Sequence, residues 1–425
     1  MSTTDPYTHM EEAWKLDGNP FPPEGIRNPD RDEPYSADVF PDETGDFKRK
    51  LVRGAIQGRR AIGFLWSRGP GGDTGYGKTT LMEAVAREIN ADLGKKVLLE
   101  SGTKPDRLLP IAAVYANLNN LDTSGLYPVL FQAVIDAAKP PRSGEQALAD
   151  RLHDKIVEGL GADDPAKIEA AIREAHLRIA PGGSPLRQEL LNAFSAGGAS
   201  TLHAQLGLVS ATSRLRNGLQ YLDFLMAVIA AAGVDHLYLF IDQLEDLATN
   251  KSVTAAKRSR EIGRIRDLLE TEPYATHAHW VFTFHNNAAL VLARYWELNR
   301  LPRFEIAPDN TASIVVLRGL SNDDQVAAVL KAYMDDKRIE PVGDELLPFE
   351  PDALGVLRQV SQGRVGIVLG KAHELFNAAA EHGRPKIDGD FAQRYFQGSV
   401  VALDGEAPDD EPLASADIDE LLLGG

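Results

Sequence analysis

Apolar runs alternate with amphipathic stretches through the first three quarters of the chain. Between the runs, apolar residues recur at helical spacing, as in LMEAVAREINADL from Leu81 onward. Short runs bounded by turn residues are typical of strands that are buried on both faces. The predicted strands are AIGFLW at 61–66, IAAVYANL at 111–118, HLYLFID at 236–242, HWVFTF at 279–284 and the shorter RFEIA at 303–307. This alternation predicts an α/β fold, a parallel sheet flanked by helices.

The segments outside this alternation divide the chain into regions. Pro, Asp and Gly are frequent up to about residue 45, where Trp14 and Phe21 are possible anchors onto the body. The stretch from about 140 to 215 is helix-forming but is interrupted by PGGSP and SAGGAS, and the text from about 320 onward is helical only. We therefore expect an N-terminal extended arm (1–45), a sheet domain (46–318) with a helical insertion (about 140–215), a helical domain (319–400) and an acidic, disordered tail (401–425).

A glycine-rich turn joins the first predicted strand to the helix that follows it. Its sequence, Gly72-Asp73-Thr74-Gly75-Tyr76-Gly77-Lys78-Thr79, matches the phosphate-binding pattern G-x-x-x-x-G-K-[ST], and Thr80 completes the expected nucleotide-contacting set. Glycines let backbone N–H groups approach a phosphate, and the following helix presents its positive end. Lys78 supplies a cation to the β- and γ-phosphates, and Thr79 supplies a hydroxyl ligand for Mg²⁺. The strand, loop and helix therefore predict a P-loop domain that binds ATP with Mg²⁺.

A carboxylate at the end of a later strand completes this chemistry. A P-loop needs such a group, on a neighbouring strand, to orient the water shell of the magnesium ion. Asp242 ends the apolar run HLYLFID and is the predicted Walker B aspartate, so that Thr79 and Asp242 form the expected metal site. Glu245 and Asp246 extend the acidic cluster beyond it.

The order of these motifs resembles that of AAA+ ATPases: P-loop, Walker B, a later strand ending in polar residues, and a Gly-Arg pair at a helix. The resemblance spans roughly residues 45–400 apart from the insertion. Within the family, VYANLNNLDTSGLYPVLFQAV and SQGRVGIVLGKAHELFNAAAEHG look most similar to the origin-recognition initiators. The resemblance implies an oligomeric ATPase with a C-terminal helical lid. The winged-helix domain of those initiators would need about a hundred further residues after 400, so their initiator function is not implied.

The residue after the Walker B aspartate departs from the family pattern. AAA+ enzymes usually have Glu there to polarise the attacking water, whereas this chain has Gln243, whose amide cannot accept a proton. The D-Q-x-E order is similar to that of STAND-class signalling NTPases, in which the nucleotide often works as a switch. We expect Glu245 to act as the base if the chain turns it inward; otherwise hydrolysis would be slow.

Polar residues after the fourth predicted strand are candidates for the group that, in AAA+ proteins, holds the attacking water and the γ-phosphate. The text VFTFHNN offers Thr283, His285 and Asn286, of which we choose Asn286. An Asn that caps a loop fits the same position equally well, because Asn often starts turns. His285 could also be a packed histidine.

Three arginines match further roles that the resemblance implies. Arg300 and Arg303, in NRLPRFEI, are candidates for the finger that reaches the ATP of a neighbouring subunit. Surface salt bridges explain either arginine at least equally well. Arg364, in Gln362-Gly363-Arg364, matches the lid arginine called sensor 2, which touches the γ-phosphate.

The composition excludes several other chemistries. The chain has no cysteine, which rules out disulfides, thiolate nucleophiles and Cys-based metal centres. No apolar run approaches the roughly 20 residues of a membrane helix, and the polar start lacks the plan of a signal peptide, so we expect a cytoplasmic protein without membrane contact. The net charge of −17, with eight acidic residues from Asp404 to Glu420, argues against a surface that coats nucleic acid.

Two basic clusters leave a local nucleic-acid contact open, although solvated helix faces or subunit contacts are the simpler interpretation. They are Lys257, Arg260 and Arg264 on one predicted helix, and Lys48, Arg49, Lys50, Arg53, Arg59 and Arg60 before the first strand. The leading hypothesis is an oligomeric ATPase that couples ATP binding and hydrolysis to remodelling, loading or regulating a protein or nucleic-acid partner. The alternatives are a signalling or defence switch with slow turnover and a non-hydrolysing structural subunit of a larger complex.

Overall fold

The computed structural model describes residues 5–23, 34, 36–58, 62–68, 75–118, 125–141, 144–307 and 311–403 of the chain. The chain divides into two compact units. The sheet unit comprises Arg27–Ser321 and Arg364–Gly366; the helical unit comprises Met1–Ile26, Asn322–Gly363 and Ile367–Gly425.

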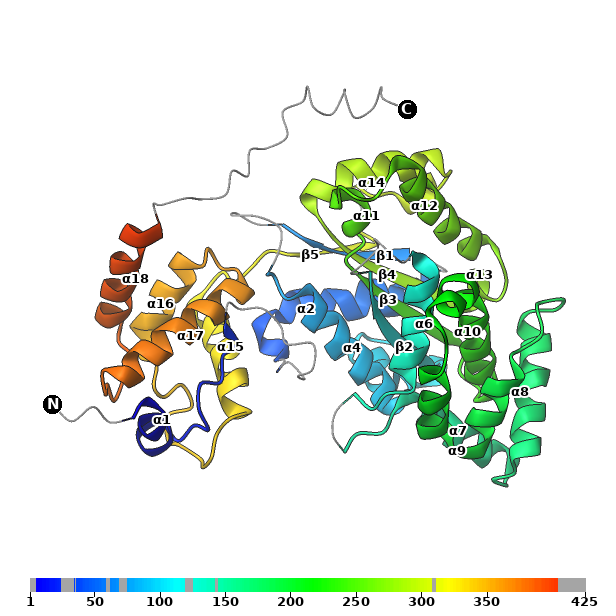
Figure 1. Cartoon of the computed structure of the whole chain (residues 1–425), viewed down its shortest axis with the longest axis horizontal. Helices are drawn as coiled ribbons and strands as arrows, with labels where there is room; N and C mark the ends of the chain where they lie inside the picture. The colour runs from blue at the N-terminus through cyan, green and yellow to red at the C-terminus, as the bar shows by residue number, and fades with distance from the viewer. Residues whose placement is uncertain are drawn as a thin grey trace. The chain divides into compact units, whose positions relative to one another are not determined.

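A five-stranded parallel sheet forms the centre of the sheet unit (Figure 1). Its strands are β1 (Ile62–Ser67), β2 (Ile111–Asn117), β3 (His236–Asp242), β4 (Ala278–His285) and β5 (Ile314–Leu317). They lie in the order β2-β3-β4-β1-β5. Most strand residues are buried, because helices cover both faces of the sheet. The predicted α/β fold with a parallel sheet flanked by helices is confirmed.

The last strand of the sheet lies later in the chain than the sequence predicts. The prediction of a strand at 303–307 is wrong, since Pro302–Phe304 form the 3-10 helix η5 and none of the residues 303–307 is buried. The segment IVVL of β5 pairs with β1 instead, from Phe64↔Ile314 to Ser67↔Leu317. A run that mixes charged and apolar residues does not fill an interior position, whereas IVVL does.

One face of the sheet packs on the π-helix η3 (Phe47–Arg53) and on α4 (Lys78–Asp92). The Tyr238 hydroxyl of β3 donates a hydrogen bond to the Val52 carbonyl of η3 at 2.6 Å. The opposite face packs on α6 (Leu126–Ala137), α10 (Ala211–Ala231), α12 (Ala255–Glu270) and α14 (Asn286–Leu298). Shorter elements complete the unit: η2 (Ala37–Val39), α2 (Pro41–Asp46), α3 (Gly54–Gly58), α5 (Lys95–Glu100), η4 (Pro105–Arg107), α11 (Asp246–Thr249) and α13 (Tyr274–His277).

Strand β2 lies at one edge of the sheet, and three of its outward backbone groups are bonded to side chains. Asn90 of α4 accepts the Ala113 N–H at 2.9 Å through Oδ1 and donates from Nδ2 to the Ala113 carbonyl at 2.7 Å. Asp136 of α6 accepts the Tyr115 N–H at 3.1 Å, and burial raises the pKa of this carboxyl to about 6. Helices on both faces thus hold β2 in place.

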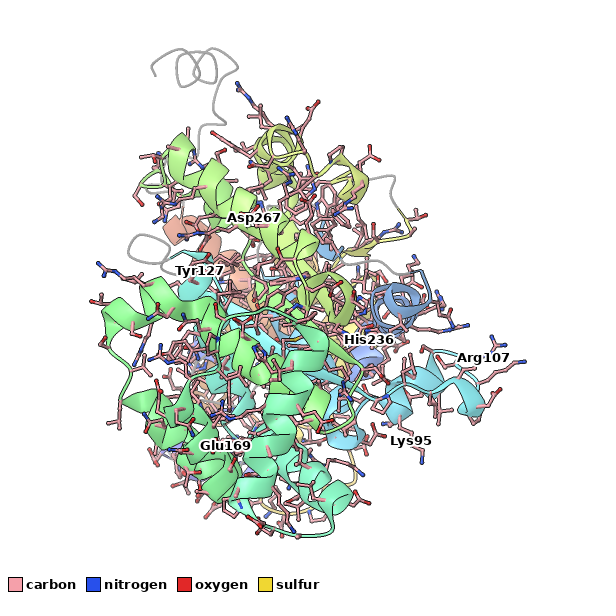
Figure 2. The ribbon with its side chains drawn as sticks, turned by 90° about the vertical axis from the view of Figure 1, so that its right-hand side faces the viewer. Lys95, Arg107, Tyr127, Glu169, His236 and Asp267 are labelled. Atoms are coloured by element: carbon pink, nitrogen blue, oxygen red, sulfur yellow. The ribbon has the colours of Figure 1, made fainter. Side chains whose placement is uncertain are left out.

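The segment predicted as an insertion is helical. It contains α7 (Leu148–Leu160), α8 (Pro165–Ile179) and α9 (Gln188–Gly207), which lead into α10. Figure 1 shows these helices grouped at the end of the sheet unit opposite α12 and α14, and Figure 2 looks onto α8, which carries Glu169. The PGGSP segment separates α8 from α9, whereas SAGGAS kinks α9 internally, where Asp150 of α7 accepts the Ala199 N–H at 2.7 Å.

The helical unit contains residues from both ends of the chain. Its helices are α1 (Pro6–Trp14), α15 (Asp323–Asp335), α16 (Pro351–Val360), α17 (Val365–Glu381), of which Val365 and Gly366 group with the sheet unit, and α18 (Gly389–Leu403). We expected an extended arm over 1–45, but Pro6–Trp14 are helical. The sequence carried a start signal that we missed, because Asp5 accepts the Thr8 N–H and Pro6 occupies the first helical position.

The N-terminal segment completes the core of the helical unit. Trp14 is fully buried, its indole N–H donates to the Pro385 carbonyl at 3.0 Å, and its ring meets Phe376 edge-on at 4.5 Å between centroids. Arg338 donates from Nη1 to the Trp14 carbonyl at 2.6 Å. Phe21 packs against the same Phe376 ring. The first residues therefore belong to the same folded unit as the last helices.

Replacing Trp14 with alanine should destabilise the helical unit by about 3 to 5 kcal/mol, because the substitution leaves a large cavity and an unpaired carbonyl. Urea denaturation of the full chain, followed by near-UV circular dichroism, measures this loss. Tyr7→Ala is the matched control on the same helix, since Tyr7 is 49% exposed and should cost about 1 kcal/mol or less. Equal midpoints for the two variants would contradict the packing role of the N-terminal segment.

Candidate nucleotide and metal site

The carboxyl ends of the parallel strands bring several polar side chains to one edge of the sheet. Ser67 ends β1, Asp242 ends β3 and His285 ends β4, and the register aligns Ser67 with His285 and Asn117 with Asp242. We expected the Walker B strand beside the P-loop strand, but β4 lies between β1 and β3. The P-loop residue that contacts Asp242 is therefore Thr79 of helix α4, and not a residue of β1.

Only the second half of the P-loop lies within the described residues; Gly72, Asp73 and Thr74 lie outside them. Gly75 has φ +80° and Gly77 has φ +83°, a left-handed conformation that a side chain would strain. Gly77 is the N-cap of α4, so Lys78 is the first helical residue and the positive end of the helix dipole lies at the loop. The Gly75 carbonyl accepts the Gly366 N–H at 2.9 Å. Tyr76 is buried, and Thr80 is half-buried in the first helical turn.

Lys78 is held between a hydroxyl and a carboxylate. Its side chain is 9% exposed, Nζ donates to Ser67 Oγ at 2.9 Å, and Nζ lies 4.0 Å from Glu245 Oε1. Glu245 is also buried, and its second oxygen, Oε2, has no hydrogen-bond partner among the described residues. Burial raises the pKa of Glu245 to about 7, although the Lys78 charge opposes that shift. A buried carboxyl with a pKa near neutrality can take up or release a proton under physiological conditions.

Asp242 accepts four hydrogen bonds, which matches the lone-pair capacity of a carboxylate. Oδ2 accepts from the Thr79 hydroxyl and, at 2.9 Å, from the Tyr115 hydroxyl. Oδ1 accepts from the Thr283 hydroxyl and, at 2.9 Å, from the Gln243 N–H. The two residues that the sequence assigned to magnesium, Thr79 and Asp242, are thus in direct contact.

Gln243 has φ +62°, a strained conformation for a residue with a side chain. Its N–H also donates to Thr283 Oγ1 at 2.8 Å, and the next N–H, that of Leu244, donates to the Thr283 carbonyl at 3.1 Å. This turn lets the chain double back, so that the carboxylate nearest Lys78 is Glu245, three residues after Asp242. The sequence predicts Glu245 as the base on condition that the chain turns it inward; the buried position of Glu245 meets that condition, and the role as base stays a prediction.

The remaining predicted site residues differ in their exposure and in their contacts. Among the three polar candidates at the end of β4 and directly after it, Thr283 bonds Asp242, whereas our choice, Asn286, is exposed as the first residue of α14. Arg300 is exposed beyond the end of α14. Arg303 pairs with Glu270 at 3.8 Å, the surface salt bridge that was its alternative interpretation.

Arg364 groups with the sheet unit, as does Gly366, whose N–H bonds the P-loop. Its Nε is buried without a hydrogen-bond partner in the described part of the chain. A phosphate oxygen could supply the hydrogen-bond acceptor that this buried guanidinium nitrogen lacks.

The basic cluster on α12 is largely occupied by internal contacts. Arg260 and Arg264 both pair with the buried Glu261, which also accepts the Leu126 N–H at the start of α6. The Arg264 guanidinium stacks on the Tyr127 ring at 4.3 Å. Before β1, Lys48, Arg49 and Lys50 each pair with carboxylates, and Arg59 and Arg60 lie outside the described residues.

Sequence reasoning missed Ser67 and Tyr115 as site residues. Tyr115 follows from strand alternation once the register is known, because Tyr115 and Asn117 share a face with Asp242 on paired strands. The described residues contain no group of three or more His, Cys, Asp or Glu side chains able to hold a metal alone. Mg²⁺ suits such a site, since it usually takes one or two protein ligands together with phosphates and water.

In the part of the chain that the structure describes, every helix is too short or too polar to span a bilayer.

Because Glu245 is buried, we predict that the stability difference between the wild type and Glu245→Gln depends on pH. An acid whose pKa is about 7 when folded and 4.5 when unfolded destabilises the fold while charged, by about 3 kcal/mol at most above pH 7. That cost fades as the pH falls from about 7 towards 4.5. Glu245→Gln should therefore raise the melting temperature at pH 8 and do so much less at pH 5.5.

Thermal denaturation from pH 5.5 to 8.5 measures this difference against Glu297→Gln, a control at an exposed position on α14. A stability gain for Glu245→Gln that is the same at every pH would contradict the burial of an ionisable group at this position.

Comparison of the sequence with models of protein families gives no match, and comparison with curated proteins gives none either. Among solved structures, the chain is similar to the ORC2 protein of Aeropyrum pernix. The match to the structure of its ADPNP–ADP complexes covers 89% of this chain and 72% of the ORC2 chain, with a TM-score of 0.46 and 12% identity. The match to the structure of its ADP form covers 90% of this chain and 74% of the ORC2 chain, with a TM-score of 0.45 and 12% identity.

Proposed function

We propose that the chain is a magnesium-dependent ATPase whose nucleotide site lies at the carboxyl edge of the sheet. The observation that carries this proposal is the contact between consecutive residues of α4 and two carboxylates of the β3 turn. Lys78 lies 4.0 Å from Glu245, and Thr79 bonds Asp242. A phosphate cation, a metal hydroxyl, a metal carboxylate and a candidate base thereby converge beside a helix N-terminus, as phosphoryl transfer requires.

Each residue has a defined role in this proposal. Thr79 and Asp242 would hold the magnesium ion, which would supply positive charge to the β- and γ-phosphates. When ATP binds, Lys78 Nζ donates hydrogen bonds to phosphate oxygens in place of the Ser67 hydroxyl. Glu245 Oε2 takes a proton from the attacking water as the water oxygen bonds to the γ-phosphorus. The bond from that phosphorus to the β–γ bridging oxygen breaks, and its electron pair leaves with ADP.

The motif order further supports an AAA+-like ATPase that acts as an oligomer on a protein or nucleic-acid partner. Arg364 is the candidate γ-phosphate contact, because its Nε lacks an acceptor and the neighbouring Gly366 bonds the P-loop. Arg300 is the better finger candidate, since Arg303 already pairs with Glu270. Asn286 is exposed and remains a weaker candidate for contact with the γ-phosphate than Thr283.

Gln243 supports a second candidate function, a switch that binds ATP and turns it over slowly. An amide occupies the position where AAA+ enzymes usually place the base, and the pKa of Glu245, about 7, leaves a share of this carboxyl protonated at neutral pH. A protonated carboxyl cannot accept the proton of the attacking water.

Three measurements on the wild-type chain test the proposal. ATP affinity by calorimetry and phosphate release are compared in Mg²⁺ and in EDTA, and mass photometry compares particle mass with and without ATP. Mg²⁺-dependent binding with turnover and ATP-dependent assembly support the oligomeric ATPase. Binding without turnover favours the switch or the structural subunit, and the absence of ATP binding overturns all three.

A further inference from the structure

Asp242 receives one of its four hydrogen bonds from Tyr115, a residue to which the sequence analysis gave no role in the site. The donors to Oδ1 are Gln243 and Thr283, which belong to the turn after β3 and to the next strand. Oδ2 is shared by Thr79 and Tyr115. Because Thr79 is the proposed metal ligand, Oδ2 is the oxygen on the metal side, and Tyr115 is its second donor.

Hydrogen bonds hold the backbone of β2 around Tyr115 and also the hydroxyl of its phenol. The Tyr115 N–H bonds Asp136, and the neighbouring Ala113 is held on both its N–H and its carbonyl by Asn90. The Asn117 amide donates to Tyr115 Oη in a long bond of 3.5 Å. The Tyr115 hydroxyl hydrogen is then left to point at Asp242.

We propose that Tyr115 is a positioning residue for the magnesium ion, an inference that rests on the proposed ATPase function. Rotation about the last torsion of an aspartate is soft, so the direction of its lone pairs depends on its donors. With both Oδ1 donors supplied by the β3 turn and β4, Tyr115 fixes the remaining oxygen from β2, on the opposite side. The hydroxyl keeps Oδ2 aligned with the water shell of the metal, as outer partners of metal ligands do elsewhere.

Tyr115→Phe tests this role, because it removes the hydroxyl and keeps the ring. The Mg²⁺ concentration that gives half of the metal-dependent gain in ATP affinity should rise about 10-fold. ATP affinity in EDTA should stay unchanged, which a merely structural defect would not allow. Tyr295→Phe, on α14, is the matched control and should leave the Mg²⁺ dependence as in the wild type.

Either of two results would overturn the inference while the proposed function stands. One is a wild-type Mg²⁺ dependence in Tyr115→Phe; the other is an equal loss of ATP affinity with and without Mg²⁺. Wild-type protein that binds ATP without any response to Mg²⁺ is a different result, since it refutes the magnesium site itself and the role of Tyr115 with it.

Discussion

Lys78→Ala is expected to weaken ATP binding by about 100-fold or more. The Lys78 side chain is nearly fully buried at the start of α4, so its contact with phosphate is a charge-assisted bond in a poorly solvated site, and its loss should cost about 3 kcal/mol. Isothermal titration calorimetry with ATP and Mg²⁺ measures the change. Lys95→Ala is the matched control, because Lys95 is an exposed lysine on α5 (Figure 2).

Removing Lys78 also leaves the buried Glu245 without its nearest cation, so the variant needs a check of folding. Lys78→Met keeps the buried alkyl stem and serves as a second variant. Both variants should retain cooperative thermal unfolding while losing ATP affinity. Wild-type affinity in either folded variant would remove the P-loop lysine from the site.

Glu245→Gln should lower ATP turnover by about 100-fold or more, because loss of a general base typically costs that factor. ATP affinity should change little, since the substitution keeps the shape of the side chain. Phosphate release at saturating ATP, together with the calorimetric affinity, measures the two quantities separately. Gln243→Ala is the control in the same turn and should retain most of the turnover.

Gln243→Glu distinguishes the two candidate functions. If Glu245 is the base, a second carboxylate at 243 is not required, and Gln243→Glu should not rescue Glu245→Gln. Turnover that appears only when Gln243 becomes Glu would show that the natural chain is not built for hydrolysis. The switch or structural-subunit function would then replace the ATPase.

The four long strands have strong local signals, and the sequence predicts all four. Four strands are long apolar runs, and each forms within a residue or two of its predicted range because a strand covered on both faces must be apolar throughout. The fifth strand is the four-residue run IVVL, too short to stand out beside RFEIA. Contact between Thr79 and Asp242 could be expected from the motifs, since their chemistry requires proximity.

Features that depend on distant contacts could not be predicted in the same way. The place of β4 between β1 and β3 follows from the packing of whole strands, and the role of Tyr115 depends on the register of β2 against β3. Trp14 finds its partners more than three hundred residues later in the chain. The left-handed turn at Gln243 is equally hidden, because Gln has no preference for that conformation.

The side-chain hydrogen bonds along the edge strand β2 affect how this protein can bind other chains. An edge strand with free amide groups is a template on which a foreign strand can be added, in peptide recognition or in aggregation. Here Asn90 already bonds the N–H and the carbonyl of Ala113, and Asp136 bonds the N–H of Tyr115, so an incoming strand would have to displace a side chain at each residue. We therefore expect partners to dock on helices or loops, and β2 to stay out of strand exchange.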